Sequence, residues 1–483
     1  MDTSACTSSN SPTIVWFRND LRLHDHEPLI MALQGGAAVV LIYCVDPRHF
    51  AASHLGVHKT GPFRARFLLE CLADLRSSCR ALGGDLLVRV GEPERVLPEL
   101  AATVGARFVY CHGDAAPEEA AVEHAVAQSL KVIGAGMRTF AGQTLVHADD
   151  LPFEVHALPD TFSQYRNRVE RRVDIRASLP APPSLPAFPV DAGELPTLRS
   201  LGLTEPTADA REMFRFYGGE TAGRERLQCW MWDADQLRTY KTTRNGLLRT
   251  DDSSKLSPWL AHGCLSPRLV YAEVRRYERE RVRNADTDWL VFELLWRDYF
   301  RLVLGRWGSR LFAAGGLHRL PYPWRRLDDH GVRVDFDKWT SGQTGFPLVD
   351  AAMIELAATG YTSNRARQNV ASFLTRVLGI DWRLGASWFE SLLVDYDVAS
   401  NWGNWAYVAG VGNDARGFRF FNVLKQARSY DPNGDFTAHW LSARDGETVP
   451  PMVDLFAAAD ASARTYERAV AKLPPAQGVT TRR

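Results

Sequence analysis

The sequence predicts an α/β domain followed by an all-helical domain. Strand-like and helix-like runs alternate over residues 12–150, a proline-rich segment follows, and strand signals largely disappear after residue 210. At 483 residues the chain is also longer than a single hydrophobic core usually supports. We therefore expect a doubly wound parallel-sheet domain (12–150), an inter-domain linker (151–210), a helical domain (211–445) and a tail (446–483).

The first domain is predicted from short β-rich runs separated by helical patterns. The predicted strands are Thr13–Phe17, Ala38–Val45, Asp85–Val90, Phe108–Cys111 and Met137–Phe140. The stretch Phe63–Leu82 between two of them carries its apolar residues on one helix face. Nearly continuous apolar strands joined by helices indicate a parallel sheet covered on both faces. No GxGxxG motif follows the first strand, so a nicotinamide-type dinucleotide site is disfavoured.

The linker contains two different kinds of sequence. Residues 177–209 hold seven prolines without clear periodicity, which predicts an extended connector. Just before them, Gln164–Arg176 holds five arginines against two acidic residues. This stretch is typical either of a solvated helix face with internal ion pairs or of a contact with nucleic acid.

Helical patterns dominate the second domain. They are predicted at Thr221–Lys241, Pro267–Arg281, Asp288–Leu304 and Phe346–Ala358. Two more lie within residues 361–412: one begins at Thr362 or Ser363 and stops at Gly379, and the next is capped by Asp381. Polar residues at these helix starts leave N–H groups and side chains free to surround a bound group.

Composition excludes several classes of protein. Basic and acidic residues number 57 each, so a polyanion would have to be held by a local basic patch. The seven cysteines form no CxxC pair and are interpreted as buried thiols in a reducing compartment, and no metal site is predicted. No apolar run reaches the roughly 20 residues of a membrane span, and residues 1–12 lack secretory or transit features. We expect an intracellular monomer, in the cytoplasm, the nucleus or an organelle.

Three local patterns carry possible chemistry. Residues 253–258 (SSKLSP) place hydroxyls, a cation and backbone N–H groups before a predicted helix, which suits phosphate oxygens but is also an ordinary capping sequence. Glu293 and Arg297 have the spacing of a surface salt bridge, yet their apolar setting favours a functional role. Tryptophans are normally core residues, but four lie near polar loop residues and suggest a stacking surface: Trp382, Trp388, Trp402 and Trp405.

Long motifs recur in a fixed order between Ile14 and about Leu441. They include WFRNDLRLHD (16–25), KTGPFRARFLLE (59–70), YKTTRNGLL (240–248), SSKLSPWLAHGCLSP (253–267), FELLWRDYFR (292–301), GQTGFPLVDAAM (342–353) and the whole of 361–412. In these motifs the sequence resembles the photolyase/cryptochrome family of FAD-binding blue-light proteins, and within it the DASH-type cryptochromes. The resemblance implies a C-terminal helical domain that holds FAD in a bent form.

The resemblance also implies which residues hold FAD. The pyrophosphate and neighbouring groups would be held by Tyr240, Ser253, Ser254, Lys255, Leu256 and Ser257. The isoalloxazine and ribityl portions would be lined by Asn364, Arg367, Asp395, Asp397 and Asn401, and Arg297 is a further candidate. Asn401 would face the flavin N5. An amide offers no carboxylic proton there, so full reduction of the flavin should be reachable.

Three indoles match the electron relay of the family. They are Trp405, Trp382 and a third that we assign to Trp324, with Trp339 as the alternative. Indole is oxidisable, and stepwise transfer between closely packed rings is faster than one long transfer.

The reaction that the resemblance implies is repair of cyclobutane pyrimidine dimers by an electron from excited reduced flavin. Glu293 would hydrogen-bond the dimer, Trp296 would pack on its rings and Asn364 would line the pocket. Arg244, Arg297 and the arginines of Gln164–Arg176 are candidates for the DNA backbone. Gln368 and Tyr407 replace the Met and Trp of other dimer photolyases, which implies poorer stacking on a flipped lesion and a preference for single strands.

Two further interpretations remain open. The protein could be a blue-light photoreceptor or redox-sensing cryptochrome without repair activity, whereas a (6-4) photolyase would need histidines that residues 364–368 and 401–407 lack. A 5,10-methenyltetrahydrofolate antenna is also implied by the resemblance. The Glu that usually assists it corresponds here to Asp114, one methylene shorter, so folate binding is expected to be weak or absent.

Overall fold

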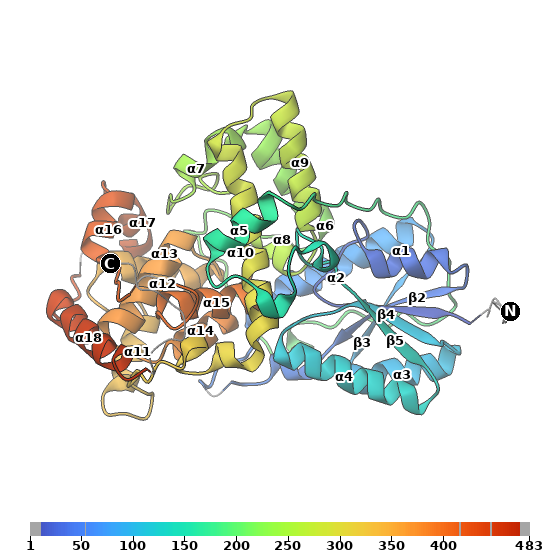
Figure 1. Cartoon of the computed structure of the whole chain (residues 1–483), viewed down its shortest axis with the longest axis horizontal. Helices are drawn as coiled ribbons and strands as arrows, with labels where there is room; N and C mark the ends of the chain where they lie inside the picture. Colours follow the sequence, from blue (N-terminus) through green and yellow to red (C-terminus); the bar gives the residue numbers. More distant parts are fainter. Residues whose placement is uncertain (1–10, 54, 415–416, 445–446, 474–483) are drawn as a thin grey trace.

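The computed structural model describes residues 11–53, 55–414, 417–444 and 447–473. The sheet and its covering helices form one end of the molecule, and the helical domain forms the other (Figure 1). The long helix α10 (Ala285–Trp307) runs between them. Within these ranges no helix has both the length and the apolar character to cross a membrane.

The sheet consists of parallel strands in the order β3-β2-β1-β4-β5. Their bounds are β1 (Thr13–Phe17), β2 (Val39–Val45), β3 (Leu86–Val90), β4 (Phe108–His112) and β5 (Gly136–Phe140). Successive side chains of a strand point to opposite faces, so Val15 packs with one buried cluster and Ile14 with another. Helices α1 (Glu27–Gln34) and α2 (Pro62–Ala81) cover the first face. The second face is covered by α3 (Pro93–Val104) and α4 (Pro117–Val132), so the predicted doubly wound sheet is confirmed.

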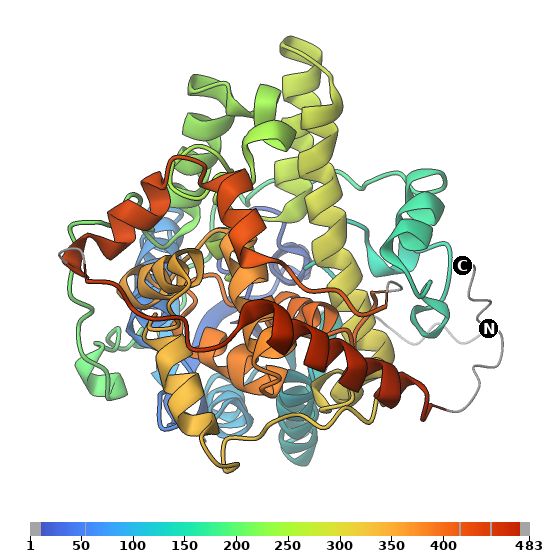
Figure 2. The ribbon, with the colours of Figure 1, turned by 90° about the vertical axis from the view of Figure 1, so that its left-hand side faces the viewer.

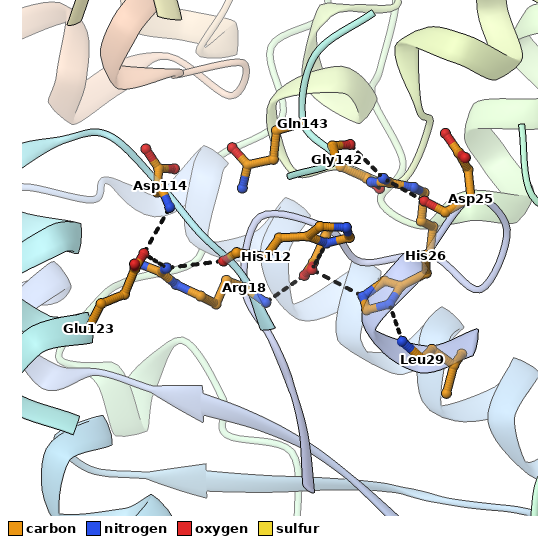
Figure 3. A network of polar contacts seen from close by, with 12 residues as sticks. Arg18, Asp25, His26, Leu29, His112, Asp114, Glu123, Gly142 and Gln143 are labelled. Carbon is orange, nitrogen blue, oxygen red and sulfur yellow. Dashed lines mark hydrogen bonds and ion pairs between the residues drawn. The ribbon is translucent and has the colours of Figure 1, made fainter. Parts of the chain in front are cut away.

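A buried polar network lies at the carboxyl-terminal end of the sheet, where doubly wound folds commonly bind ligands. That place lies beyond the carboxyl ends of the neighbouring strands β1 and β4. There the Asp20 Oδ2 lies 2.6 Å from His112 Nδ1 and 3.0 Å from His26 Nε2 (Figure 3). A Cβ built at Gly142 would lie only 2.3 Å from His112 Nε2, so the next loop packs directly against the imidazole. The protein's own side chains and loop therefore fill the space beyond the carboxyl ends of β1 and β4.

Helix α10 holds the segment that follows β5. The Asp298 carboxylate accepts the N–H groups of Leu145 and Val146 at 3.0 and 2.9 Å. Arg297 donates to the Gln143 carbonyl at 2.5 Å, and Arg301 donates to the side chain of the same glutamine. Burial raises the pKa of Asp298 to about 6. Charged side chains of the helical domain thus make hydrogen bonds to polar groups of the α/β domain.

The connector runs along the α/β domain. Leu185 donates its N–H to Leu82, and Ala192 accepts from the N–H of Val88, at 2.8 and 2.9 Å. The basic stretch before it is only partly helical, because α5 ends at Glu170 (Phe162–Glu170). Arg166 pairs with Glu170, and Arg176 pairs with Asp150, both at 2.6 Å. These pairs agree with the interpretation of a solvated, ion-paired stretch.

The second domain is helical, as predicted. Beyond α10 it contains α6 (Glu220–Leu227), α7 (Tyr240–Thr243), α8 (Ser257–Ala261), α9 (Pro267–Glu280), α11 (Val332–Thr340), α12 (Pro347–Thr359), α13 (Asn364–Ser372), α14 (Trp382–Leu392), α15 (Val398–Val408), α16 (Val423–Tyr430), α17 (Asp435–Leu441) and α18 (Leu455–Val470). Ser363 and Asp381 cap α13 and α14, as predicted. The predicted tail contains α18, which lies diagonally across the face shown in Figure 2 and buries Leu455, so the helical domain extends beyond residue 445.

Two expectations need correction. Thr221–Lys241 is not one helix: a π-helical turn and a 3-10 turn separate α6 from α7. The break occurs because Asp235 adopts a left-handed φ of 54°, while its carboxylate accepts hydrogen bonds from Tyr277 and Arg281. The cysteines are also not all buried, because Cys229 is exposed; Cys6 lies outside the described residues.

Candidate functional site

One large cavity, of about 550 Å³, collects almost all of the predicted site residues. Trp324, Trp382 and the arginines of Gln164–Arg176 do not line it. The site residues that line it are Tyr240, Arg244, Ser253, Ser254, Lys255, Leu256, Ser257, Glu293, Trp296, Arg297, Asn364, Arg367, Gln368, Asp395, Asp397, Asn401, Trp405 and Tyr407. Its volume is in the range of small-molecule and cofactor sites.

The serine-rich loop before α8 forms one side of this cavity. Arg226 holds the loop from behind by donating to the carbonyls of Ser254 and Ser253 at 3.0 and 3.2 Å. Lys255 adopts a left-handed φ of 53°, and its ammonium lies 4.9 Å from the centre of the Tyr361 ring. Backbone N–H groups and serine hydroxyls in such a loop suit the phosphate oxygens of FAD.

The acidic loop before α15 forms another side. Asp395 accepts from Arg367 at 3.0 Å through Oδ2, whereas its buried Oδ1 has no hydrogen-bond partner among the described residues. A buried acceptor of this kind fits a ligand that brings an N–H or O–H group. Asp397 caps α15 through Ser400 and pairs with Arg301. Burial would raise the pKa of Asp397, but Arg301, Arg297 and the Ser400 N–H outweigh it and hold the pKa at about 2.

The Asn401 side chain is held in place by its Nδ2 group alone. Its Nδ2 donates to the carbonyl of Ala386 at 3.0 Å, so Oδ1 is the atom left to accept from a ligand in the cavity. An acceptor suits a flavin N5 that carries hydrogen. Together with the unpaired Asp395 oxygen and the serine loop, this arrangement fits FAD.

Glu293 and Trp296 lie on α10 and face the same cavity. Glu293 is paired with Arg244, at 2.6 Å, and not with Arg297 four residues along the helix. The Trp296 ring is stacked on Phe162 with centroids 3.8 Å apart and planes 10° apart, and it also lines the cavity. Arg297 is turned to the carbonyls of Gln143 and Leu260, so the structure does not support the predicted contact between Arg297 and the DNA backbone.

The rest of the predicted lesion side lies around Gln368 and Arg365. Arg365 donates to the Gln368 side chain at 2.7 Å and to Asn245 at 2.9 Å. Asn364 is exposed although it lines the cavity, so it lies near solvent. Tyr407 packs edge-on against Trp296, with centroids 6.0 Å apart.

The structure favours Trp324 over Trp339 as the outer indole. The indole N–H groups of Trp324 and Trp382 donate to the same carbonyl, that of Ala314, at 3.0 and 3.1 Å. A Cβ at Gly385 would lie 2.2 Å from the ring of Trp405, so Trp405 packs against the first turn of the helix that Trp382 begins. Trp339 is fully buried beside Trp405 and cannot serve as an outer member.

A possible metal-binding cluster consists of Asp20, His26 and His112, whose ligand atoms lie within 4.8 Å of one another. Burial lowers the pKa of His112 to about 4, so its imidazole is neutral and has one N–H. That N–H can donate to Asp20 Oδ2, while Oδ1 accepts the N–H of Arg18 at 2.6 Å. Hydrogen bonds therefore account for both Asp20 oxygens, whereas His26 Nε2 and His112 Nε2 have no hydrogen-bond partner among the described residues.

Comparison with known proteins assigns the chain to a family. Residues 13–186 match DNA photolyase, and residues 289–465 match the FAD binding domain of DNA photolyase. A cryptochrome DASH of Gloeobacter violaceus is 55% identical over 444 residues, which are 92% of this chain and 87% of that relative. The chain belongs to the photolyase/cryptochrome family. Its relatives named cryptochrome DASH identify it as a DASH-type cryptochrome, as predicted.

Solved structures agree with the DASH-type assignment. The crystal structure of a Synechocystis cryptochrome superposes with a TM-score of 0.90 at 46% identity, covering 94% of this chain and 99% of that one. A class III photolyase of Agrobacterium tumefaciens superposes with a TM-score of 0.82 at 29% identity, covering 98% and 100%. The expectation of FAD as cofactor is confirmed by the match to the FAD-binding domain.

Sequence reasoning missed several residues of this DASH-type site. Phe162 supports Trp296, Trp289 donates to Glu293 at 3.0 Å, and Arg226 holds the serine loop. Trp289 lies one helical turn before Glu293, so the i, i+4 rule could have found it. Phe162 and Arg226 act across long sequence separations, and the sequence carries no local signal of such contacts.

Proposed function

We propose that the protein is a light-driven DNA photolyase that repairs cyclobutane pyrimidine dimers, with a preference for single-stranded DNA. The observation that carries the proposal is the single cavity in which Glu293 and Trp296 lie together with the Asp395 and Asn401 groups that fit FAD. Lesion-binding and cofactor-binding side chains thus share one space.

When bound, reduced FAD supplies the light-driven electron that opens the dimer. The chain's own residues bind and orient the lesion. Glu293 would hydrogen-bond a pyrimidine edge, and Trp296 would pack on the two rings, which are no longer aromatic. Arg244 would hold the Glu293 carboxylate in position, since the two side chains already form an ion pair.

The preference for single strands follows from the same side chains. A dimer must leave the helical stack before it can enter the cavity, at a cost of a few kcal/mol that is least in single-stranded DNA. Gln368 offers a flipped lesion no aromatic surface, and Tyr407 offers a smaller one than a tryptophan. Less stacking energy is therefore available to offset the cost of flipping from a duplex.

Folate binding is expected to be weak. The Asp114 carboxylate lies 3.8 Å from the Arg301 guanidinium and caps the N–H of Ala116 at 3.1 Å. Its side chain is almost completely buried, at 5% exposure. These contacts already satisfy the carboxylate, so a pterin ring would have to displace them.

Repair of one defined thymine dimer, under blue light with a thiol reductant, tests the proposal. The dimer is placed first in a single strand and then in the matched duplex, and Glu293→Ala serves as the impaired control. Strong repair of the single strand with little repair of the duplex is the expected result. If FAD is bound and photoreducible but neither substrate is repaired, the protein is a photoreceptor or redox-sensing cryptochrome and the proposal is wrong.

A further inference from the structure

We propose that Trp402 is a second terminal electron donor, or outlet, of the tryptophan relay. When Trp382 is oxidised, either Trp402 or Trp324 can give it an electron, so the two compete. The proposal depends on FAD binding but not on DNA repair. Trp382 is the branch point because it has two indole neighbours. It shares the Ala314 carbonyl with Trp324, and it packs against Trp402.

The contact between Trp382 and Trp402 is direct. Their ring centroids lie 5.7 Å apart with planes 78° apart, which is a T-shaped pair in van der Waals contact. Electron transfer between aromatic rings slows steeply as the edges separate, so neighbours in contact exchange electrons fastest. Phe312 packs on Trp402 at 4.9 Å and helps to fix this geometry.

Trp402 is also the more accessible of the two outlets. Trp382 is fully buried and Trp324 is 8% exposed, whereas Trp402 is only partly buried. An outlet has to be re-reduced by a molecule from solution. A larger exposed surface favours that step at Trp402.

The acceptors of the three indole N–H groups differ in how readily they take up a proton. Trp324 and Trp382 donate to a backbone carbonyl, which is a very weak base. Trp402 donates its Nε1–H to the Tyr396 hydroxyl oxygen at 3.3 Å, and the Glu390 carboxylate interacts electrostatically with Tyr396. Burial raises the pKa of Glu390, which makes its carboxylate a better proton acceptor.

The proposed step conserves electrons and protons. When bound, light-excited FAD would supply the oxidising equivalent, and electron transfer through Trp405 would leave Trp382 short of one electron. Trp402 gives one electron to Trp382, while its Nε1 proton passes to Tyr396 and the Tyr396 hydroxyl proton passes to Glu390. Trp382 is then restored, and Trp402 is a neutral radical that cannot easily return. A thiol in solution gives a hydrogen atom to Trp402, and Glu390 releases its proton.

Single and double substitutions test the branch. Trp324→Phe, Trp402→Phe, the double variant and the control Trp307→Phe are compared by transient absorption of indole radicals and by photoreduction with thiol. Trp307 is a partly buried indole held between Arg306 and Arg310, and among the described ring pairs it contacts none of the relay tryptophans. FAD content, measured by absorbance, verifies folding of each variant.

Each single variant should keep a reduced yield of long-lived radical, the double variant should lose it, and the control should match the unmodified protein. The proposal is overturned if Trp324→Phe alone removes the long-lived radical, or if the double variant equals Trp324→Phe.

Two further measurements separate the outlet from a structural role. Tyr396→Phe keeps the ring but removes the proton acceptor, so in the Trp324→Phe background the radical should become short-lived. The unmodified protein, illuminated without thiol, should show oxidised Trp402 by peptide mass spectrometry. Oxidation of Trp324 without oxidation of Trp402 contradicts the proposal and does not depend on the folding of any variant.

Discussion

A single oxygen of Glu293 accepts hydrogen bonds from both Arg244 and Trp289, at 2.6 and 3.0 Å. Within the described part of the chain, the hydrogen bonds of this carboxylate involve only Oε1, so Oε2 is the atom available to a lesion. Burial raises the pKa of Glu293, while Arg244 and Trp289 oppose the rise. The two donors therefore fix the direction of the group and limit the rise of its pKa.

Replacing Glu293 should impair repair and leave FAD in place. Glu293→Ala is expected to lower the repair rate under saturating light by roughly tenfold, which corresponds to one lost hydrogen bond of about 1.4 kcal/mol. Arg244→Ala should cause a similar loss, and the double variant should be little worse than either, because the two side chains act as one unit. Glu293→Gln, which keeps the shape, is the control. Repair by Glu293→Ala at the unmodified rate would show that the lesion pocket is assigned wrongly.

Asn401→Asp should destabilise the protein and restrict photoreduction. The change removes the Nδ2 donor and leaves the buried Ala386 carbonyl unpaired, at a cost of about 1–3 kcal/mol. A carboxyl group at this position can also offer a proton to the flavin, so photoreduction should stop after one electron. Asn404→Asp is the matched control, since Asn404 is exposed at the cavity lining on the same helix and donates to the Ser400 carbonyl. Urea unfolding and absorbance under blue light measure the two effects, and equal behaviour of both variants would argue against the assigned role.

Two buried histidines should destabilise the fold as the pH falls from 7 to 5. Burial lowers the pKa of His112 and of His262 to about 4, below the unperturbed value of about 6.5. Stability is therefore fully present above pH 6.5 and is lost as the pH falls towards 4, by up to about 1.4 kcal/mol per pH unit for each histidine. Asp298 and Glu119 act in the opposite direction, because burial raises their pKa values to about 6 and 7. The histidine part is therefore measured as a difference between variants in the free energy of unfolding in urea at saturating FAD. Between pH 7 and pH 5, His262→Asn should lose less stability than the unmodified protein, and His124→Asn, at an exposed histidine, should match the unmodified protein; equal slopes for all three would contradict the prediction.

Gly142→Ala should destabilise the buried network at the sheet edge. The added methyl group would lie 2.3 Å from His112 Nε2, and the fully buried imidazole has no free space to move into. We expect a loss of about 1–3 kcal/mol in the free energy of unfolding. Gly113→Ala is the control, because its Cβ would make only ordinary contacts at 3.5 Å. A Gly142→Ala variant as stable as Gly113→Ala would mean that the loop shifts freely.

Much of the fold could be predicted because its signals are local. The strand Thr13–Phe17 and the helix near Phe63 are found within a residue or two, since apolar runs and one-sided helix faces depend on neighbouring residues. The break at Asp235 was not predictable, because a left-handed residue is stabilised there by Tyr277 and Arg281 from a distant helix.

The candidate site shows the same division. Its serine loop and its acidic loop lie in continuous motifs, so their residues were predicted. The partner of Glu293 was not, because local spacing pointed to Arg297 whereas the ion pair is made by Arg244, 49 residues away. The clear choice between Trp324 and Trp339 also depends on one shared carbonyl, which no sequence pattern reveals.

The hydrogen bonds between α10 and residues 143–146 limit where this chain could be cut into separately folding fragments. A fragment that began at residue 211 would remove the Leu145 and Val146 N–H groups that Asp298 accepts, and the Gln143 groups that Arg297 and Arg301 contact. It would also expose to water the side of α10 that these residues now cover, so it should not fold alone. The α/β domain is therefore a scaffold that the flavin-binding half requires, and its retention in the chain needs no second pigment to explain it.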